Sequence, residues 1–328
     1  MSQPEKKITK QALQMLSDVG FLHLKNVKGF DEDDLLATIK EFHALPDKIK
    51  HQMKPRNYVK SHTNNFRGWF PFLDNDVSHK EFFDMGAPWH EVSDHQRQFP
   101  CVEETPFPKA KKYEALVKKY NDYWYFLLEI CLHLLDCIAV GLGKKKDYFR
   151  EWFQTESLST FRSIHYLPRS KTGVKTDKLD QHGLKLITPE HSDTGFITLL
   201  STFMYPGLQV EIKGKYRSVK PEKNHLVVNL GTIFARITNY KLKATKHRVL
   251  DIGRERFSCP FFLEPKFDVP IPADITVGAD GQTEPPIQYG VYNVTRLRNS
   301  YGEWKGLKLP GEEGYVPKDI MSKVKRWD

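Results

Sequence analysis

Apolar side chains recur every three or four positions over residues 108–143, which predicts one long amphipathic helix. Gly143 is typical of a helix C-terminus and predicts where this helix stops. Shorter helical patterns cover residues 8–16 and 30–43, and Asp31 is a suitable N-cap for the second of them. The first half of the chain is therefore expected to be mainly helical, with the long helix supporting the rest of the fold.

Beyond Ser157 the pattern changes to an alternation of apolar and polar positions, which is typical of β-strands. Polar turn sequences separate the alternating segments. Short strands at this spacing predict a β core of the sandwich, jelly-roll or barrel type. The expected strands are residues 158–166, 195–201, 208–212, 216–219, 226–230, 247–250 and 256–262.

The segment between the helical and the β-rich parts, residues 55–107, is rich in aromatic and turn residues and has no clear period. We interpret it as a long ordered loop, and loops of this length tend to carry function. A helical pattern returns near the end of the chain. We expect residues 1–150 to form a helical region whose loop covers the active site, residues 151–280 to form the β core, and residues 281–328 to form a C-terminal helix and tail.

The composition and charge of the chain argue against nucleic-acid-binding and membrane-spanning classes of protein. Of the 328 residues, 39% are hydrophobic and 28% charged, which is typical of a globular protein. The net charge of +9 could attract anions. It is spread along the chain, however, and no nucleic-acid-binding motif accompanies it, so we expect no nucleic-acid partner. No apolar run reaches about eighteen residues, so no membrane span is expected. The N-terminus lacks a signal-like apolar stretch and the four cysteines form no CxxC pair, which predicts a cytoplasmic protein, expected to be a monomer.

The strongest candidate for chemistry is the tripeptide His191-Ser192-Asp193. Residues two apart in a strand point to the same side, so both side chains could reach one metal ion. His247 begins another predicted strand and is well placed to supply a third ligand. Two imidazoles and one carboxylate are the ligand set of Fe(II) in non-haem oxygenases, and they leave coordination positions open. The tripeptide alone is weak evidence, because residues 79–81 have the same form.

A second pair follows nine residues after His247. Arg256 and Ser258 occupy alternate positions of a predicted strand and therefore share a face. An arginine can bind a carboxylate through two parallel hydrogen bonds, and a serine hydroxyl can add a third donor. A metal with such a carboxylate clamp nearby is suited to a chelating 2-oxo acid.

Several segments together resemble the isopenicillin N synthase-like family of Fe(II)- and 2-oxoglutarate-dependent oxygenases, over nearly the whole chain. The segments that carry the resemblance are GFLHLKN (20–26), EFHALP (41–46), FRGWFP (66–71), KEFFDMG (80–86), FRSIHYLP (161–168), HSDTGFITLL (191–200), GLQV (207–210), HLVVNLGTIF (225–234), ITNYKLKATKHRVL (237–250) and RFSCPFFLEP (256–265).

The resemblance implies a double-stranded β-helix, or jelly roll, with a long helix supporting one sheet. It implies that His191, Asp193 and His247 are the iron ligands and catalytic residues. It also implies that Arg256 and Ser258, assisted by Tyr166, bind the distal carboxylate of 2-oxoglutarate. The implied reaction uses O2 to oxidise a C–H bond of a small molecule, by hydroxylation, desaturation or oxidative ring closure, and releases succinate and CO2. Ascorbate is the expected reductant in vitro.

The chain departs from the family pattern at three places. Ile164 stands where many plant members have asparagine, so the iron-proximal carboxylate of 2-oxoglutarate needs another partner or only the iron. Thr232 follows Gly231 where aspartate is usual, and Tyr240 replaces the glycine of a Thr-Asn-Gly turn. None of these positions is a presumed metal ligand. Residues 170–190 resemble an insertion and are either a lid or a solvated loop.

Substrate contacts are the least constrained prediction. The basic charge and candidate pocket arginines favour a small anionic, amino-acid-like metabolite. An isopenicillin N synthase-like oxidase that uses no 2-oxoglutarate is the alternative, and a catalytically inactive binding protein on the same fold is disfavoured because all three ligand residues are present. The candidate substrate-binding residues are Asn65, Arg67, Trp69, Phe196 and Phe262, and for Arg67 a structural role in the loop is the favoured interpretation.

Overall fold

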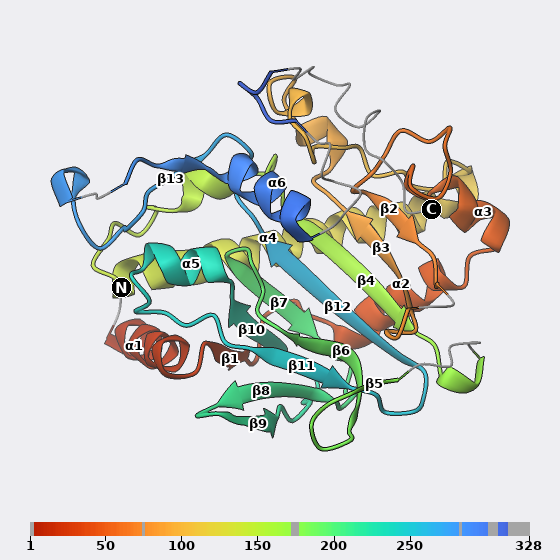
Figure 1. The fold of residues 1–328 in the computed structure, drawn as a ribbon, viewed down its shortest axis with the longest axis horizontal. Coiled ribbons are helices and arrows are strands. Elements are labelled where there is room, and N and C mark those ends of the chain that lie inside the picture. The colour runs from red at the N-terminus through yellow and green to blue at the C-terminus, as the bar shows by residue number, and fades with distance from the viewer. Residues whose placement is uncertain (1–2, 74–75, 172–176, 282–283, 301–307, 314–328) are drawn as a thin grey trace.

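Two β-sheets and one long helix organise the chain (Figure 1). The structure is a computed structural model, and it describes residues 3–73, 76–171, 177–281, 284–300 and 308–313.

The larger sheet has seven strands in the order β1-β10-β7-β12-β4-β3-β2, and all neighbouring strands in it are antiparallel. It therefore combines strands from both halves of the chain. Its strands are β1 (Phe21–Leu24), β2 (Gly68–Phe70), β3 (Lys80–Met85), β4 (Thr160–Tyr166), β7 (Ile197–Ser201), β10 (Leu226–Leu230) and β12 (Arg256–Leu263).

The smaller sheet has five antiparallel strands in the order β5-β6-β11-β8-β9. A separate two-stranded ribbon joins β13 to β14. These strands are β5 (Lys178–Leu179), β6 (Lys185–His191), β8 (Leu208–Ile212), β9 (Lys215–Ser218), β11 (His247–Leu250), β13 (Pro270–Ile271) and β14 (Ile287–Gln288).

The helices lie outside the sheets, and the longest of them, α4, runs behind the larger sheet in Figure 1. Asp31 caps α2 as its sequence predicts, since its carboxylate accepts hydrogen bonds from the backbone of Asp33 and Asp34. The α-helices are α1 (Gln3–Asp18), α2 (Glu32–His43), α3 (Asp47–Gln52), α4 (Glu114–Gly141), α5 (Thr232–Ile237) and α6 (Tyr289–Ser300). The 3-10 helices are η1 (Trp89–Glu91), η2 (Gln96–Gln98), η3 (Lys111–Tyr113), η4 (Arg150–Phe153), η5 (Arg169–Lys171) and η6 (Ala279–Gly281).

Apolar side chains fill the space between the two sheets as well as the space under α4. Phe21 and Val227 of the larger sheet pack with Leu208 of the smaller one, and Tyr166 packs with Ile187 in the same way. The largest cluster lies on the other face of the seven-stranded sheet, where α4 buries its apolar stripe. This mainly β architecture, in which two sheets face each other, agrees with the predicted fold class.

All seven strands expected after Ser157 are present, with ends that shift by no more than a few residues. Two predicted loops contain strands instead. Residues 55–107 include β2 and β3, so the region 1–150 contributes three strands to the larger sheet and is not purely helical. Residues 170–190 include β5 and most of β6, although residues 172–176 of that stretch lie outside the described residues.

The segment Lys111–Gly141 is long and apolar enough to cross a membrane by length and composition alone. The search for uninterrupted apolar runs missed this property. In the structure the helix buries Tyr120, Trp124 and Leu135 against the sheet, as the core helix of a folded domain does.

Two departures from the family pattern have visible structural roles. Thr232, which stands where aspartate is usual, donates from its backbone N–H to the carbonyl of Asp193 at 2.8 Å. The preceding Gly231 is needed for this close approach, because a Cβ added there would lie 2.0 Å from the carbonyl oxygen of Gly195. Tyr240 adopts a left-handed conformation with a φ of 55°, which the usual glycine of that turn would reach without strain.

Candidate active site

Three side chains from the smaller sheet and the loop after it converge on one point. His191 ends β6, Asp193 follows in the loop, and His247 begins β11. The β6–β11 register pairs His191 directly with His247, and their ring centroids are 4.2 Å apart. Asp193 Oδ1 lies 3.7 Å from Nε2 of each histidine. One potential ligand atom from each residue lies within 4.8 Å of the other two, so the group could hold one metal ion.

Contacts around these residues orient them for metal binding. Nδ1 of His191 lies 2.8 Å from the carbonyl of Pro189, and Nδ1 of His247 lies 3.2 Å from that of Thr245. Donation from Nδ1–H to these carbonyls leaves each Nε2 with a free lone pair, which is the usual arrangement of a metal-binding histidine. Burial lowers the pKa of His247, which keeps its imidazole neutral at neutral pH.

Asp193 is held in place by two further side chains. Its Oδ2 accepts a hydrogen bond of 2.6 Å from the Thr198 hydroxyl and one of 2.7 Å from the Asn229 amide. Both donors lie on strands of the larger sheet, so this sheet fixes a carboxylate that follows a strand of the smaller one. Sequence reasoning did not single out either residue. The available signal was Asn229 itself, a polar residue inside the apolar run of β10.

Substituting these two donors tests their role. We expect Thr198→Val and Asn229→Leu to weaken metal binding or turnover by roughly 10- to 100-fold each, because loss of an outer partner lets the ligand carboxylate rotate. The measurement is Fe(II) affinity together with turnover at saturating Fe(II). Thr202→Val, in the turn after β7, is the matched control. Unchanged iron affinity and turnover in both variants would show that Asp193 needs no such support.

The predicted carboxylate clamp forms a buried group on β4 and β12. Arg256 pairs in register with Tyr166, and its guanidinium carbon lies 4.6 Å from the centre of the Tyr166 ring. Tyr166 in turn hydrogen-bonds Ser258 and Thr188. Arg256 is 3% exposed, and its Nε and Nη1 have no hydrogen-bond partner among the described residues. Burial lowers the pKa of Arg256, and an unpaired buried guanidinium of this kind favours an anionic ligand.

The clamp lies a short distance along the sheet from the three converging residues. Thr188, which hydrogen-bonds Tyr166, pairs in register with Val249, two positions after His247. Two residues along a strand span about 7 Å. A short dicarboxylate bound to a metal at His247 would therefore reach Arg256 with its other end.

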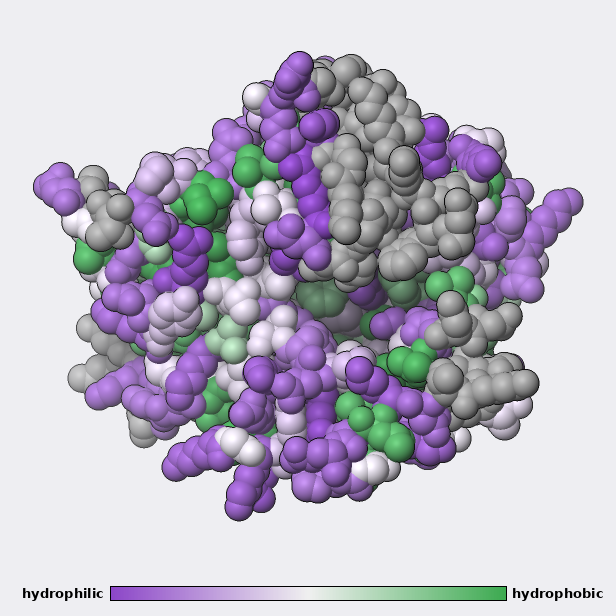
Figure 2. Space-filling view, in the orientation of Figure 1, coloured by the Kyte–Doolittle hydropathy of each residue, from purple (hydrophilic) through white to green (hydrophobic). Residues whose placement is uncertain are grey.

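A cavity of 330 Å³ opens beside His191 and Asp193. Three arginines line it, Arg67, Arg162 and Arg296, and besides Asp193 it has two further acidic residues, Asp84 and Glu264. Arg162 forms a bidentate pair with Asp84, with both N···O distances 2.6 Å. The face of the molecule drawn in Figure 2 is hollowed near its middle and is mostly hydrophilic around the hollow.

The candidate substrate residues separate into two groups. Arg67 and Phe262 line the cavity. The Arg67 guanidinium also donates to Thr160 Oγ1 at 2.6 Å and to the carbonyl of Leu158 at 3.1 Å, so it has the structural role that the sequence favoured. The structure does not bring the other three candidates to the cavity.

Each of these three residues is committed elsewhere. Trp69 donates from Nε1 to Glu81 at 2.9 Å, and Asn65 donates to the carbonyl of Thr63 at 3.0 Å. Phe196 is fully buried and packs edge-on against Phe153. Proximity to the motifs in the sequence does not predict where these side chains point, because their orientation depends on strand register that the sequence does not reveal.

Comparisons with known proteins identify a family for the part of the chain that contains these residues. The family model of the 2OG-Fe(II) oxygenase superfamily matches residues 161–265, which include all of the metal-ligand and clamp candidates. Residues 161–265 belong to the 2OG-Fe(II) oxygenase superfamily. Isopenicillin N synthase from Penicillium chrysogenum is 29% identical over 87% of this chain and 88% of that protein. The predicted resemblance is thus confirmed.

Solved structures agree on the fold. A full-length Neurospora crassa protein solved in complex with alpha-KG has a TM-score of 0.71 and 23% identity, over 89% of this chain and 90% of that one. A putative 2OG-Fe(II) oxygenase family protein from Caulobacter crescentus has a TM-score of 0.73 and 24% identity, over 91% and 96%. The match to this superfamily supports a 2-oxoglutarate-dependent dioxygenase that uses Fe(II), and the three converging residues could hold its metal ion.

A second histidine–glutamate group in the oxygenase serves the fold. It includes Glu81 of the other His-x-acid tripeptide. Glu81 Oε1 lies 3.2 Å from His43 Nδ1 and 2.9 Å from His165 Nδ1, and its Oε2 accepts a hydrogen bond of 3.2 Å from Lys50. Trp69 also donates to Oε2. Burial alone would raise the pKa of Glu81, but hydrogen bonds from His165 and His43 lower it well below 4.5 overall.

We expect Glu81→Gln to destabilise the oxygenase by about 3–5 kcal/mol, because it removes the buried charge partner of Lys50 and leaves that ammonium only the exposed Asp47, 3.3 Å away. A lowered pKa in the folded state means that the Glu81 charge stabilises the protein above pH 4.5. The difference between wild type and variant should therefore be full at neutral pH and shrink below 4.5. Urea unfolding at several pH values measures it.

The matched control is Glu255→Gln, since Glu255 also contacts His165, at 2.8 Å, but is exposed to solvent. Its loss should change stability by no more than about 0.5 kcal/mol. Equal effects of the two substitutions would contradict a buried role for Glu81.

Proposed function

We propose that His191, Asp193 and His247 hold Fe(II) in this oxygenase and that Arg256, with Ser258 and Tyr166, binds the distal carboxylate of 2-oxoglutarate. The observation that carries the proposal is the buried Arg256 guanidinium, two of whose nitrogen atoms have no partner in the described part of the chain and which lies one short strand segment from His247. A carboxylate there would satisfy the unpaired donors, and the two histidines and Asp193 would bind the iron. Fe(II), when bound, would supply the O2-dependent oxidation of a substrate C–H bond. This oxidation is coupled to the decarboxylation of 2-oxoglutarate, which yields succinate and CO2.

The protein's own contribution is position and charge. Thr198 and Asn229 fix the Asp193 carboxylate, and the backbone carbonyls of Pro189 and Thr245 fix the two imidazoles. His191 and Asp193 also face the cavity, which Arg67, Arg162 and Phe262 line. A substrate held there would present its C–H bond beside the metal position and would displace water from it.

We propose a small anionic, amino-acid-like metabolite as the substrate class. Support comes from the charges around the cavity. Arg296 on α6 donates to Asn293 at 3.1 Å, while its buried Nε has no hydrogen-bond partner within the described part of the chain. Glu264, another acidic residue of the cavity, is half-buried, and its partial removal from water raises its pKa. Unpaired cationic donors beside acidic groups fit a molecule that carries both a carboxylate and an amine.

A panel of N-alkylated amino acids and di- and tricarboxylic acids tests this proposal. The readout is succinate formed from 2-oxoglutarate with Fe(II), ascorbate and O2. We expect stimulation only by anionic substrates, and a KM for the substrate that rises in Arg296→Ala without a comparable rise for 2-oxoglutarate. Stimulation by neutral apolar compounds alone would overturn the substrate class.

A second candidate function is an isopenicillin N synthase-like oxidation that consumes no 2-oxoglutarate. The observation in its favour is the similarity to isopenicillin N synthase across 87% of the chain. In that case Arg256 and Ser258 would bind a substrate carboxylate. O2 consumption without succinate formation would favour this function, and equal amounts of product and succinate would exclude it.

A further inference from the structure

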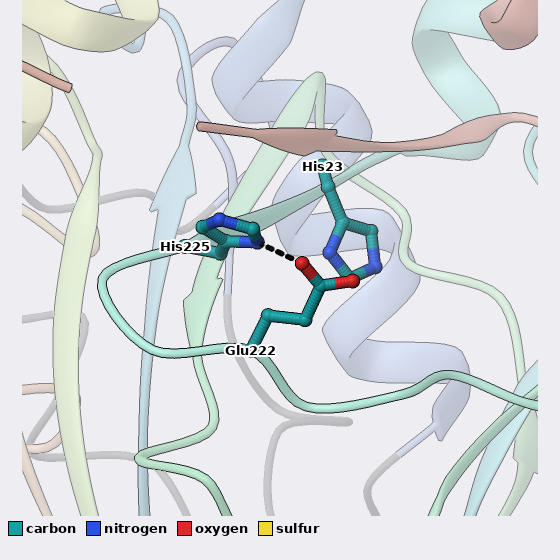
Figure 3. A group of neighbouring side chains, drawn as sticks. All are labelled: His23, Glu222 and His225. Carbon is teal, nitrogen blue, oxygen red and sulfur yellow. Dashed lines mark ion pairs between the residues drawn. The ribbon is translucent and has the colours of Figure 1, made fainter. Parts of the chain in front are cut away.

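A third histidine–glutamate group lies at the edge of the larger sheet, and none of its residues lines the cavity beside His191 and Asp193. His23 belongs to the edge strand β1, and His225 lies immediately before β10, to which β1 pairs with Leu24 opposite Leu226. Glu222 belongs to the turn that leads into β10. Figure 3 shows that the two imidazoles and the carboxylate face one another across this turn.

The geometry of this group is that of a metal-binding cluster. One potential ligand atom from each of the three residues lies within 4.8 Å of the other two. His225 Nδ1 and Glu222 Oε2 are 3.1 Å apart, and the two imidazole rings stand nearly perpendicular, with centroids 6.0 Å apart. His23 Nδ1 is shielded from solvent and has no hydrogen-bond partner among the residues that the structure describes.

The charges favour a neutral imidazole at His23. Its pKa is lowered, first by burial and then by the neighbouring His225 and Lys25, although Glu222 acts in the opposite direction. A shielded neutral nitrogen without a partner is costly, and a cation would satisfy it. The pKa of Glu222 is lowered too, mainly by its hydrogen bond from Lys25, so its carboxylate is ionised.

We propose that His23, Glu222 and His225 form a second metal site, which binds a divalent cation of the zinc class. Two imidazoles and one carboxylate with open positions for water suit Zn²⁺. The bound ion would fasten the edge strand β1 to the turn before β10, and so would join segments that lie far apart in the chain. No part of this site overlaps His191, Asp193 or His247.

The buried group around Glu81 has the same residue types as the group at the edge strand, but its carboxylate is not free to bind a metal ion. Both oxygens of Glu81 already accept hydrogen bonds, and the Lys50 ammonium lies 3.2 Å from one of them. A cation there would have to displace a buried lysine. At the edge-strand site the competing cation is Lys25, whose ammonium lies 3.3 Å from Glu222 Oε2 and whose side chain is 55% exposed. Lys25 can therefore swing into solvent when a metal binds.

The test uses chelator-treated protein in an Asp193→Ala background, which removes the proposed iron site, and isothermal titration with ZnCl₂. We expect one zinc equivalent for Asp193→Ala and none for Asp193→Ala combined with His225→Asn or with Glu222→Gln. Adding Lys25→Ala to Asp193→Ala should tighten zinc binding by roughly tenfold or more, since a charge-assisted competitor is gone. Zinc should also raise the melting temperature of the Asp193→Ala protein but not that of the double variants.

The matched control is His133→Asn in the Asp193→Ala background. His133 forms a comparable pair with Glu129, 3.1 Å apart, on the exposed face of α4 but without a third ligand among the described residues. It should leave the zinc stoichiometry at one. Circular dichroism of every variant establishes that it is folded. A folded His225→Asn/Asp193→Ala protein that still binds one zinc equivalent, or an Asp193→Ala protein that binds none, would overturn the proposal. Two equivalents in Asp193→Ala that fall to one on loss of His225 would support the proposal, and the remaining equivalent would be the one that His191 and His247 still bind.

Discussion

We expect His247→Ala to lose essentially all turnover while the protein stays folded. The imidazole faces Asp193 and His191, and its Nε2 is the atom that β11 contributes to the group. Removing it leaves two ligands for the iron. The loss should exceed the roughly 10- to 100-fold effect that follows from losing a partner that only orients a ligand. Succinate formation measures turnover, and circular dichroism checks the fold.

The control for this substitution is His133→Ala, which removes an exposed histidine from α4 and should leave turnover unchanged. His191→Ala should behave like His247→Ala, although His191 is far more exposed. Equal losses of turnover in the two variants would point to metal binding, because a loss caused only by disturbed packing should be larger at the buried His247 than at the exposed His191. Full turnover in both variants would remove these histidines from the metal site.

The strands after Ser157 could be predicted because their alternating pattern matches their environment. Where both faces are covered, as in β10 and β12 between α4 and the smaller sheet, the strands show instead as short apolar segments bounded by turn sequences. β3 could not be predicted because Glu81 and Asp84 occupy buried positions on its two opposite faces, so it lacks the usual alternation. Glu81 is buried only because His43, His165 and Lys50 satisfy it, and these partners lie far apart in the sequence.

β6 was missed for a different reason. Its sequence contains Pro189, which argues against an interior strand, and its last residues are exposed. Yet it pairs with β5 on one side and β11 on the other. In the pairing of β6 with β11, His191 lies opposite His247 and Thr188 lies opposite Val249, and the register shifts between these two pairs. Pro189 lies within this irregular stretch of β6. Such an irregularity follows from tertiary pairing and leaves no trace in local periodicity.

The metal-ligand candidates could be found because residue type and spacing carry the chemistry. The cavity could not be found in the same way, since Asp84, Arg162 and Arg296 come from β3, β4 and α6. Their proximity depends on how the larger sheet orders its strands. Arg67 illustrates the limit: its place beside the motif was visible, but its hydrogen bonds to Thr160 and Leu158 were not.

The second large effect is expected at Arg256. Arg256→Ala should raise the apparent KM for 2-oxoglutarate by roughly ten- to a few-hundred-fold, which corresponds to about 1.5–3 kcal/mol for a hydrogen bond to a charged group. The physical reason is that Arg256 is buried with Nε and Nη1 unpaired among the described residues, so a carboxylate is its natural partner. Arg256→Lys should rescue only partly, since lysine cannot form a two-pronged contact.

The measurement compares the KM for 2-oxoglutarate with substrate affinity determined without turnover. Arg217→Ala, on the outer strand β9, is the matched control and should change neither quantity. Tyr166→Phe should raise the KM for 2-oxoglutarate less than Arg256→Ala does, because Tyr166 holds the guanidinium by ring contact and its hydroxyl is shared with Ser258 and Thr188. If Arg256→Ala weakens substrate affinity and leaves the 2-oxoglutarate KM unchanged, the clamp binds the substrate, and the oxidation that needs no 2-oxoglutarate becomes the better account of this chain.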